Sequence, residues 1–367
     1  MKTTRFLMIG GFLGAGKTTT IGKLAGHYVS QGLNVALVTN DQAFDLVDTH
    51  TLRAQGFVVG EVPGACFCCK FDDLIDTVGA MSTDAVPDIV IAEPVGSCTD
   101  LVATVIEPMR ELFGDRFELG PLVVLLKPSH GKKILGETQG RGFSPKAEYI
   151  FLKQLEEADA IAVNKIDRLS EEQREELLQL LEQRFPGKRT FGFSAREGIG
   201  LEQLIDAAQA DPIERKQMMD MDYVTYAEGE AELGWLNCQV RAESEDRFEL
   251  DRLVLDLVEK IGRQLHDATC EVAHLKILGQ TMHDAAVANL VSSSVSSELS
   301  LASEIKTTGA DILVNARVAA SPEQLEAIVR EVTSMQATEM GIQLTVGNMQ
   351  SFRPGKPEPT HRVGGIT

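Results

Sequence analysis

Hydrophobic positions in the first half of the chain form short, compact apolar runs separated by helix-type segments. The runs predicted as parallel strands are 6–9, 34–38, 87–92, 122–126 and 160–163, with a further β-type run at 190–193. Uninterrupted apolar runs are typical of strands that are buried on both faces. Ser170 and Gln173 form a capping box that begins a helix ending near Pro186, and 201–208 predicts a second helix. The pattern predicts an α/β domain over residues 1–212, with a mainly parallel sheet and helices on both faces.

The second half of the chain changes to the periodicity of a smaller α+β domain. After a connector at 213–231, alternating positions predict strands at 236–240, 273–277, 312–318 and 342–346, and periodic apolar positions predict helices at 250–261 and 321–332. We therefore expect an accessory domain over 232–352, with two helices on one antiparallel sheet in a ferredoxin-like arrangement. The Ser-rich stretch 292–300 has no predicted element. Residues 353–367 hold three prolines and three glycines and are predicted to be a disordered tail.

The net charge and the lengths of the apolar runs limit the kinds of partner that we expect for this protein. The chain has 35 Lys and Arg against 54 Asp and Glu, for a formal net charge of −19. Such a surface repels phosphate backbones and anionic lipids, so we expect no nucleic acid and no membrane as partner. The longest uninterrupted apolar run, 122–126, is far shorter than the roughly 18 residues needed to cross a bilayer. Six cysteines in so long a chain do not form a disulfide framework, which predicts reduced thiols in a cytoplasmic protein.

A phosphate-binding loop follows the first predicted strand. Gly11-Phe12-Leu13-Gly14-Ala15-Gly16-Lys17-Thr18 fits the pattern G-x-x-x-x-G-K-S/T between a strand and a helix. In this pattern the glycines let backbone N–H groups surround phosphates, the lysine places a cation against the β and γ phosphates, and the hydroxyl faces Mg²⁺. The residues expected at the nucleotide here are Gly11, Gly14, Ala15, Gly16, Lys17, Thr18 and Thr19.

A second motif predicts which base is bound. Asn164-Lys165-Ile166-Asp167 follows the fifth predicted strand, at the carboxyl edge where open α/β sheets bind ligands. A carboxylate at Asp167 can accept two N–H donors of guanine, whereas adenine offers an acceptor at one of these positions. Ser194 and Ala195 follow the run 190–193 and complete the candidate base site. The sequence therefore predicts GTP and GDP as the bound nucleotides.

Two acidic residues end strands at the same edge. Asp41 ends the second predicted strand and Glu93 ends the third. Carboxylates that converge on the γ-phosphate side suit Mg²⁺, directly or through water, and can align the attacking water. We expect Thr18, Asp41 and Glu93 at the magnesium ion and Lys17, Asp41 and Glu93 as the catalytic groups. Helix caps or solvated acids at strand ends are the alternative.

Three of the cysteines form a second candidate site. Cys66-Phe67-Cys68-Cys69 lies between the strands that end at Asp41 and Glu93. Thiolates suit Zn²⁺ or Cu(I), and all three can bind one ion only if the chain turns at Cys68, with a fourth ligand from elsewhere. Three ligands and an open position suit an ion that is handed on. Buried small hydrophobes or a redox switch remain alternatives, and Cys98, Cys238 and Cys270 are predicted to be core residues.

Together these motifs resemble the CobW/HypB/UreG family of P-loop GTPases over roughly residues 5–210. The Cys-x-Cys-Cys run is most similar to the CobW-like branch, whose members are GTP-hydrolysing metallochaperones with a C-terminal accessory domain. The resemblance implies that nucleotide state gates metal binding and that the metal passes to a client metalloenzyme or cofactor pathway. Zn²⁺ is the expected metal on ligand chemistry. Co²⁺, or service to a corrinoid (cobalamin) protein, is the alternative, and a nucleotide-dependent homodimer is a further expectation.

Two other classes of function stay open at this point. A P-loop kinase or ATP-dependent ligase would also use Lys17 and Thr18, but it would not need Asp167. An iron–sulfur or redox-sensing protein could use the three clustered cysteines together with Cys98.

Overall fold

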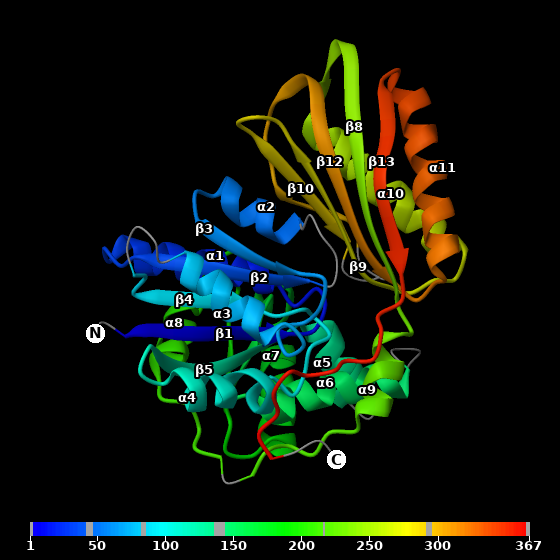
Figure 1. The fold of residues 1–367 in the computed structure, drawn as a ribbon. Coiled ribbons are helices and arrows are strands. Elements are labelled where there is room, and N and C mark those ends of the chain that lie inside the picture. The colour runs from blue at the N-terminus through cyan, green and yellow to red at the C-terminus, as the bar shows by residue number, and fades with distance from the viewer. Residues whose placement is uncertain are drawn as a thin grey trace. The chain divides into compact units, whose positions relative to one another are not determined.

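The computed structural model describes residues 3–41, 47–81, 86–135, 144–215, 217–290 and 296–364. The chain divides into two compact units (Figure 1). Unit 1 comprises Met1–Gln42, Phe57–Gly229 and Lys356–Thr367, and unit 2 comprises Ala43–Gly56 and Glu230–Gly355. Among the helices in these described ranges, none combines the length and apolar character that crossing a membrane requires.

Unit 1 is built on a seven-stranded sheet in the order β3-β2-β4-β1-β5-β6-β7, and every strand pair in it is parallel. The strands are β1 (Thr4–Gly11), β2 (Val35–Asp41), β3 (Val58–Pro63), β4 (Ile89–Glu93), β5 (Phe117–Leu126), β6 (Ala160–Val163) and β7 (Arg189–Gly192). The five predicted strands are all present. The β-type run 190–193 corresponds to β7 at one edge, and β3, which was not predicted, lies at the other edge. β3 lacks a continuous apolar run because the side chains of an edge strand are partly exposed to solvent. Val58 of β3 is one such exposed residue.

The described helices of unit 1 include the three that the sequence predicts, after the phosphate loop, from Ser170 to near Pro186 and at 201–208. They are α1 (Lys17–Ser30), α3 (Phe71–Ala80), α4 (Glu107–Phe113), α5 (Pro128–Leu135), α6 (Pro145–Glu157), α7 (Glu171–Arg184), α8 (Leu201–Gln209) and α9 (Tyr223–Glu230), with a π-helical turn at Val102–Ile106 and a 3₁₀ turn at Ile166–Arg168. The predicted capping box is confirmed. The Ser170 hydroxyl accepts the Gln173 N–H at 3.2 Å, and the Gln173 side chain accepts the Ser170 N–H at 3.3 Å.

Unit 2 is an antiparallel sheet in the order β11-β10-β9-β12-β8-β13 with two long helices. Its elements are α2 (Val47–Ala54), β8 (Gly234–Glu249), α10 (Leu250–Asp267), β9 (Val272–Gln280), β10 (Ala285–Leu290), β11 (Glu298–Leu301), β12 (Lys306–Val318), α11 (Pro322–Met340) and β13 (Gln343–Phe352). The four strands β9, β12, β8 and β13 with α10 and α11 form the predicted ferredoxin-like arrangement. β10 and β11 extend it, and residues 292–295 of the Ser-rich stretch lie outside the described residues.

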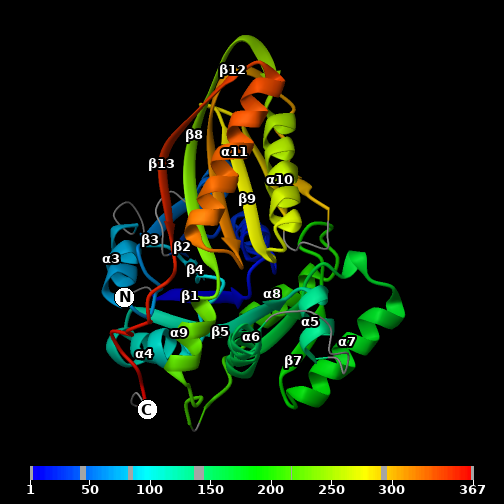
Figure 2. The ribbon, with the colours of Figure 1, turned by 90° about the vertical axis from the view of Figure 1, so that its right-hand side faces the viewer.

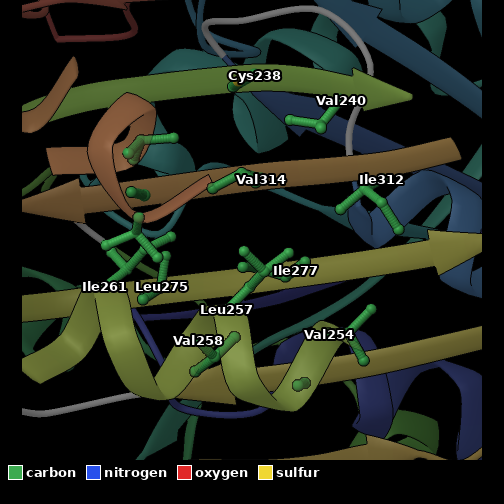
Figure 3. Packing of buried hydrophobic residues seen from close by; sticks show 14 of the residues in the cluster. Cys238, Val240, Val254, Leu257, Val258, Ile261, Leu275, Ile277, Ile312 and Val314 are labelled. Carbon is green, nitrogen blue, oxygen red and sulfur yellow. The ribbon is translucent and has the colours of Figure 1, made fainter. Parts of the chain in front are cut away.

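The core of unit 2 lies between its sheet and α10 and α11, which run side by side (Figure 2). The helical repeat places Val254, Leu257, Val258 and Ile261 on one face of α10, and Figure 3 shows these side chains directed at β9 and β12. Burial of each such side chain contributes about 1.5–3 kcal/mol. This packing explains why the apolar periodicity of α10 was readable from the sequence.

The division into units differs from the predicted boundaries in the segment after β2. Residues 43–56 interrupt the first domain in sequence but belong to unit 2. Val47 packs with three side chains of the sheet, namely Leu278, Val287 and Leu313. Its N–H donates to the Asn315 side chain at 3.0 Å. These contacts span more than 220 residues, so reading the chain continuously assigned the segment to the wrong domain.

The predicted connector and tail also differ from the structure. The connector 213–231 contains α9, and Tyr223 and Tyr226 of this helix are buried. The tail expected to be disordered follows a defined path across unit 1 up to residue 364, drawn in red in Figures 1 and 2, while 365–367 lie outside the described residues. Composition suggested disorder, but hydrogen bonds from this segment to residues 68–103 hold it in place.

Candidate nucleotide and metal site

The phosphate loop connects β1 to α1 at the carboxyl edge of the parallel sheet. Gly16, the N-cap of α1, has φ +93°, and an added Cβ there would lie 2.4 Å from the Asn164 side chain. Only glycine satisfies both conditions. The Lys17 ammonium donates to the Gly11 carbonyl at 3.0 Å, so it lies inside the loop where phosphates would bind. The exposed Thr19 follows Thr18 in the first turn of α1, whose N-terminus favours anions.

Asn164 joins the predicted phosphate and base motifs. Its side-chain amide donates to the Ala15 carbonyl at 2.9 Å. Its oxygen accepts the N–H groups of Lys165 at 2.8 Å and Ala195 at 3.0 Å. The side chain is 2% exposed, so these bonds form away from water. One residue thus holds three segments together, separated in sequence by up to 180 residues.

The base motif presents its carboxylate to solvent. Lys165 has φ +63°, a conformation that costs about 1 kcal/mol for a residue with a side chain. This bend begins the 3₁₀ turn Ile166–Arg168, where Asp167 is exposed. Ser194 is buried beside Ala195, and its hydroxyl accepts the Glu197 N–H at 3.2 Å. The bend thus places the exposed Asp167 carboxylate directly after β6, at the carboxyl edge of the sheet.

Oxygen donors for Mg²⁺ lie next to the phosphate loop. The Thr18 hydroxyl donates to the Glu93 carboxylate at 3.2 Å, and both side chains are buried. Asp41 ends β2, the neighbour of β4, and Thr39 pairs with Glu93 in that ladder. Hydroxyl and carboxylate oxygens are the hard ligands that Mg²⁺ prefers, so Thr18 and Glu93 fit the ion, with Asp41 two residues beyond the paired position.

The cysteine motif forms a tight turn that leads into α3. The N–H groups of Cys69 and Lys70 both donate to the Cys66 carbonyl, at 2.9 and 3.0 Å. This turn is the one that the sequence required if all three thiols were to converge. The sulfur atoms of Cys66, Cys68 and Cys69 lie within 4.8 Å of one another, with 3.7 Å between those of Cys68 and Cys69. The geometry suits capture of one soft metal ion.

Asn40, which sequence reasoning missed, holds this turn in place. Its amide group donates to the carbonyls of Val62 and Ala65, both at 2.7 Å, and its oxygen accepts the Phe67 N–H at 2.8 Å. The side chain is 6% exposed. A buried amide within an apolar strand is unusual, and that was the available signal. Because Asn40 precedes Asp41, the end of β2 is connected directly to the cysteine turn.

The thiols of the cluster differ in acidity. Hydrogen bonds from the thiols of Cys68, Cys69 and Cys98 hold the pKa of Cys66 well below its ordinary value. The bond to Cys66 raises the pKa of Cys68 well above its ordinary value and that of Cys69 to about 12. One thiolate stabilised by neighbouring thiols can bind a metal first, after which the cation lowers the pKa of the others.

Cys98 is buried, as the core prediction requires, with 2% of the residue exposed. A hydrogen bond from its thiol contributes to the lowered pKa of Cys66, but Cys98 is not among the three cysteines whose sulfur atoms lie within 4.8 Å of one another. Cys238 and Cys270 are buried in unit 2, as expected.

The C-terminal segment runs across the cysteine turn. The Glu358 N–H donates to the Cys69 sulfur at 3.2 Å, and the Thr360 N–H donates to the Cys68 carbonyl at 2.8 Å. Arg362 then forms an ion pair with Asp100 at 2.7 Å, with 5% and 1% of the two side chains exposed. The metal motif is thus covered by a segment nearly 300 residues distant in sequence.

Comparison of the sequence with known proteins identifies its family. The model of the CobW/HypB/UreG nucleotide-binding domain matches residues 5–191. The zinc chaperone YeiR of Escherichia coli K12 is 31% identical over 182 residues, covering 47% of this chain and 50% of that protein. The match therefore spans about half the length of this curated relative.

Two solved structures are similar at lower identity. HypB from Helicobacter pylori in complex with nickel is 18% identical with a TM-score of 0.41, covering 56% of this chain and 85% of that chain. The Zn(II)-bound YjiA GTPase from E. coli is 14% identical with a TM-score of 0.39, covering 90% and 99%. The family match rests on the sequence, and because it covers more than half of the chain, the protein belongs to the CobW/HypB/UreG family.

Proposed function

We propose that this protein is a GTP-hydrolysing metallochaperone that carries a transition metal on Cys66, Cys68 and Cys69 and releases it to a client according to nucleotide state. The observation that carries the proposal is the connection through Asn40. Its side chain bonds to the loop on both sides of Gly64 and to the cysteine turn, and Asp41 follows it at the end of β2. In this proposal, Asn40 is the residue through which a shift at the end of β2 reaches the cysteine turn.

The nucleotide in this proposal is GTP, bound with Mg²⁺ between the phosphate loop and Asp167. Lys17 offsets the negative charge of the β and γ phosphates, and backbone N–H groups of the loop surround them. Thr18 and Glu93 would hold the magnesium ion, which would offset negative charge on the phosphates, and Asp41 and Glu93 would orient the attacking water. Asp167 selects guanine, as the side-chain chemistry of its exposed carboxylate allows.

The metal in this proposal is Zn²⁺, with Co²⁺ as the second candidate. Thiolates bind both ions, and Zn²⁺ accepts the four-coordinate tetrahedral geometry that a compact thiol cluster offers. The 31% identity to a zinc chaperone in the nucleotide-binding half supports this choice. The recipient is a metalloenzyme or, in the alternative, a corrinoid protein, and a nucleotide-dependent homodimer is the proposed assembly.

The experiment is a competition titration of Zn²⁺, and then Co²⁺, into protein loaded with GDP or with a non-hydrolysable GTP analogue. Coupling of about 1–3 kcal/mol between the sites predicts a difference of roughly 5- to 150-fold in metal affinity. By linkage, saturating metal must change the affinity for the GTP analogue by the same factor.

Two variants make this experiment specific. The double variant Cys66→Ser and Cys68→Ser removes two thiolates, so tight metal binding and the nucleotide effect should both disappear. Cys270→Ser, a buried thiol of unit 2, is the matched control and should behave as the parent protein. Equal metal affinities in the two nucleotide states, or tight binding that survives both serines, would refute the proposed function.

A further inference from the structure

The C-terminal segment contacts the cysteine turn from alternate residues. The Glu358 N–H donates to the Cys69 sulfur at 3.2 Å. Two residues further on, the Thr360 N–H donates to the Cys68 carbonyl at 2.8 Å, and the Thr360 hydroxyl donates to the Cys69 carbonyl at 3.3 Å. Alternate residues of an extended chain face the same side. This stretch therefore lies on the turn with one side of its backbone facing the thiols.

Two prolines prepare the stretch for its contact with sulfur. Pro357 and Pro359 flank Glu358. Proline fixes its own φ and favours an extended conformation in the residue before it, so the stretch loses little conformational entropy when it lies on the turn. Proline also has no backbone N–H. The Glu358 N–H is therefore the one backbone donor in 357–359, and it is directed at a sulfur of the metal motif.

We propose that residues 357–363 form a lid over the metal site. In this proposal the Glu358 N–H positions the Cys69 thiolate, and the metal passes to an acceptor after the lid has opened. The inference rests on the proposed function, and it adds the step that controls the rate of metal transfer.

The lid lies beside the most exposed thiol of the cluster. Cys66 and Cys68 are each 2% exposed, whereas Cys69 is partly exposed. Zinc can expand from four to five ligands, so an acceptor group that reaches the ion can bind before a thiolate leaves. An acceptor that approaches past Cys69 meets the lid first, because the lid bonds to both the sulfur and the carbonyl of this residue.

A buried ion pair fastens the far end of the lid. Arg362 contacts Asp100 at 2.7 Å, with 5% and 1% of the two side chains exposed. The Tyr223 hydroxyl donates to the same carboxylate at 2.7 Å. Removing one partner of a buried, hydrogen-bonded pair leaves the other charge uncompensated, which is costly. Arg362 therefore sets how often the lid opens.

Nearer the thiols, the lid is held weakly enough to open. Glu358 and Thr360 are exposed, so they bury little apolar surface. His361 adds one ring contact, edge-on to Phe71 with the centroids 4.9 Å apart. Segments with few buried apolar contacts open locally while the rest of the fold persists. The cysteine turn has its own support in Asn40, so it keeps its shape when the lid opens.

The first test measures alkylation of Cys69 by iodoacetamide in the metal-free protein. Arg362→Ala should raise the rate at least about tenfold, because loss of the buried pair favours the open lid. Arg362→Lys keeps the charge without the planar guanidinium, and it should give an intermediate rate. Cys270, which is buried in unit 2, is the internal control and should react at the parental rate in all three proteins.

The second test follows transfer of Zn²⁺ from the loaded protein, without nucleotide, to a chromogenic pyridylazo chelator. In the parent, transfer waits for the lid to open, so the rate should reach a plateau as the chelator concentration rises. In Arg362→Ala, the rate should keep rising with chelator concentration and exceed the parental plateau at least about tenfold. A residue that only stabilises the fold would not remove the plateau.

The third test concerns the positioning role of the Glu358 N–H. Glu358→Pro removes this donor and extends the run of prolines. Zn²⁺ affinity should fall about tenfold, the scale on which hydrogen-bond partners of metal ligands act. Glu358→Ala loses an exposed side chain but keeps the N–H, so this matched control should bind Zn²⁺ as the parent does.

The outcomes separate this inference from the proposed function. If the parent shows nucleotide-dependent Zn²⁺ affinity but Arg362→Ala leaves alkylation and transfer unchanged, the lid is wrong while the metallochaperone proposal stands. Parental Zn²⁺ affinity in Glu358→Pro would overturn the positioning role. If the parent holds no Zn²⁺ on the three cysteines, both proposals fail. Circular dichroism at the assay temperature checks folding, and Arg362→Lys and Glu358→Pro decide the matter if Arg362→Ala is unfolded.

Discussion

The phosphate loop and the cysteine cluster lie at the same edge of one sheet, but they are assembled in opposite ways. The loop is a single run of eight residues whose glycines, lysine and helix N-terminus suit phosphate by themselves, and Asn164 adds one support from outside. The cluster depends on three segments that are distant in sequence, namely the turn 66–69, Asn40 in β2 and the C-terminal segment. A site built from one run is readable from sequence, whereas a site built from three depends on the fold.

The difference also explains how one site can respond to the other. The loop is held by its own backbone and by Asn164, whereas the cysteine turn is held by two separate anchors, Asn40 and Thr360. A small displacement between two anchored segments changes ligand distances more than a displacement within one segment. We therefore expect perturbations of the loop to affect catalysis and perturbations of the anchors to affect stability and metal binding.

The largest expected effect separates the two regions. Lys17→Ala should lower GTP hydrolysis about 10³-fold or more, the scale on which a cation acts at a transferred phosphoryl group. Zn²⁺ affinity in the absence of nucleotide should stay within about twofold, because coupling between the sites requires a ligand at both. The rate of hydrolysis is measured as the amount of phosphate released over time. Lys23→Ala, which changes an exposed lysine of α1, is the control. Hydrolysis at the parental rate would mean that the loop is misassigned.

Arg362→Ala should act on the opposite region. It leaves Asp100 buried without its cation, which should destabilise unit 1 by about 3 kcal/mol. Hydrogen exchange measured by mass spectrometry should show faster exchange in residues 66–80, and thiol alkylation should show faster modification of Cys69. Arg241→Ala breaks an ion pair with Asp311 that is half exposed, so it should change stability by less than about 1 kcal/mol. Equal effects of the two variants would show that the C-terminal segment does not support the cluster.

The Asp167→Asn variant tests the prediction that Asp167 selects guanine as the bound base. Loss of the charge-assisted acceptor should weaken GTP binding by about 1.5–3 kcal/mol, or roughly 10- to 100-fold. The GTP preference measured by competition with ATP should fall by the same factor. An unchanged preference would favour the alternative of an ATP-dependent enzyme and remove guanine recognition from this motif.

The smallest effect concerns pH and the buried carboxyl group of Glu157, which accepts the Thr99 hydroxyl at 3.1 Å. Burial raises the pKa of Glu157 to about 8 from 4.5, so the folded state holds a proton that the unfolded state has lost. The native state binds more protons in this range, and the free energy of unfolding should therefore fall as pH rises from 5 to 8, by about 1.4 kcal/mol per pH unit. Urea denaturation at pH 6 and pH 7 measures the slope. The Glu157→Gln variant carries no titrating proton at this position and should reduce the slope by that amount. If the variant and the parent show the same slope, other groups cause the pH dependence.

Much of the fold was readable because its signals are local. The five central strands each contain a compact apolar run, α10 shows one apolar face over five turns, and Ser170 and Gln173 satisfy their cap within four residues. The edge strands were less clear because half-exposed strands have weaker patterns. The tail was misjudged because proline and glycine content reports backbone preference, while the ion pair of Arg362 with Asp100 depends on a distant partner.

By itself, the sequence determined the order of the motifs, the two kinds of sheet and the residues of the phosphate loop, because neighbouring residues decide each of these through backbone conformation and periodic burial. The tertiary structure alone decided that residues 43–56 belong to unit 2, that Asn40 holds the cysteine turn, and that the C-terminal segment bonds to that turn. The two contacts to the turn join residues 27 and 289 positions apart, and their energies become favourable only after the fold has brought the segments together.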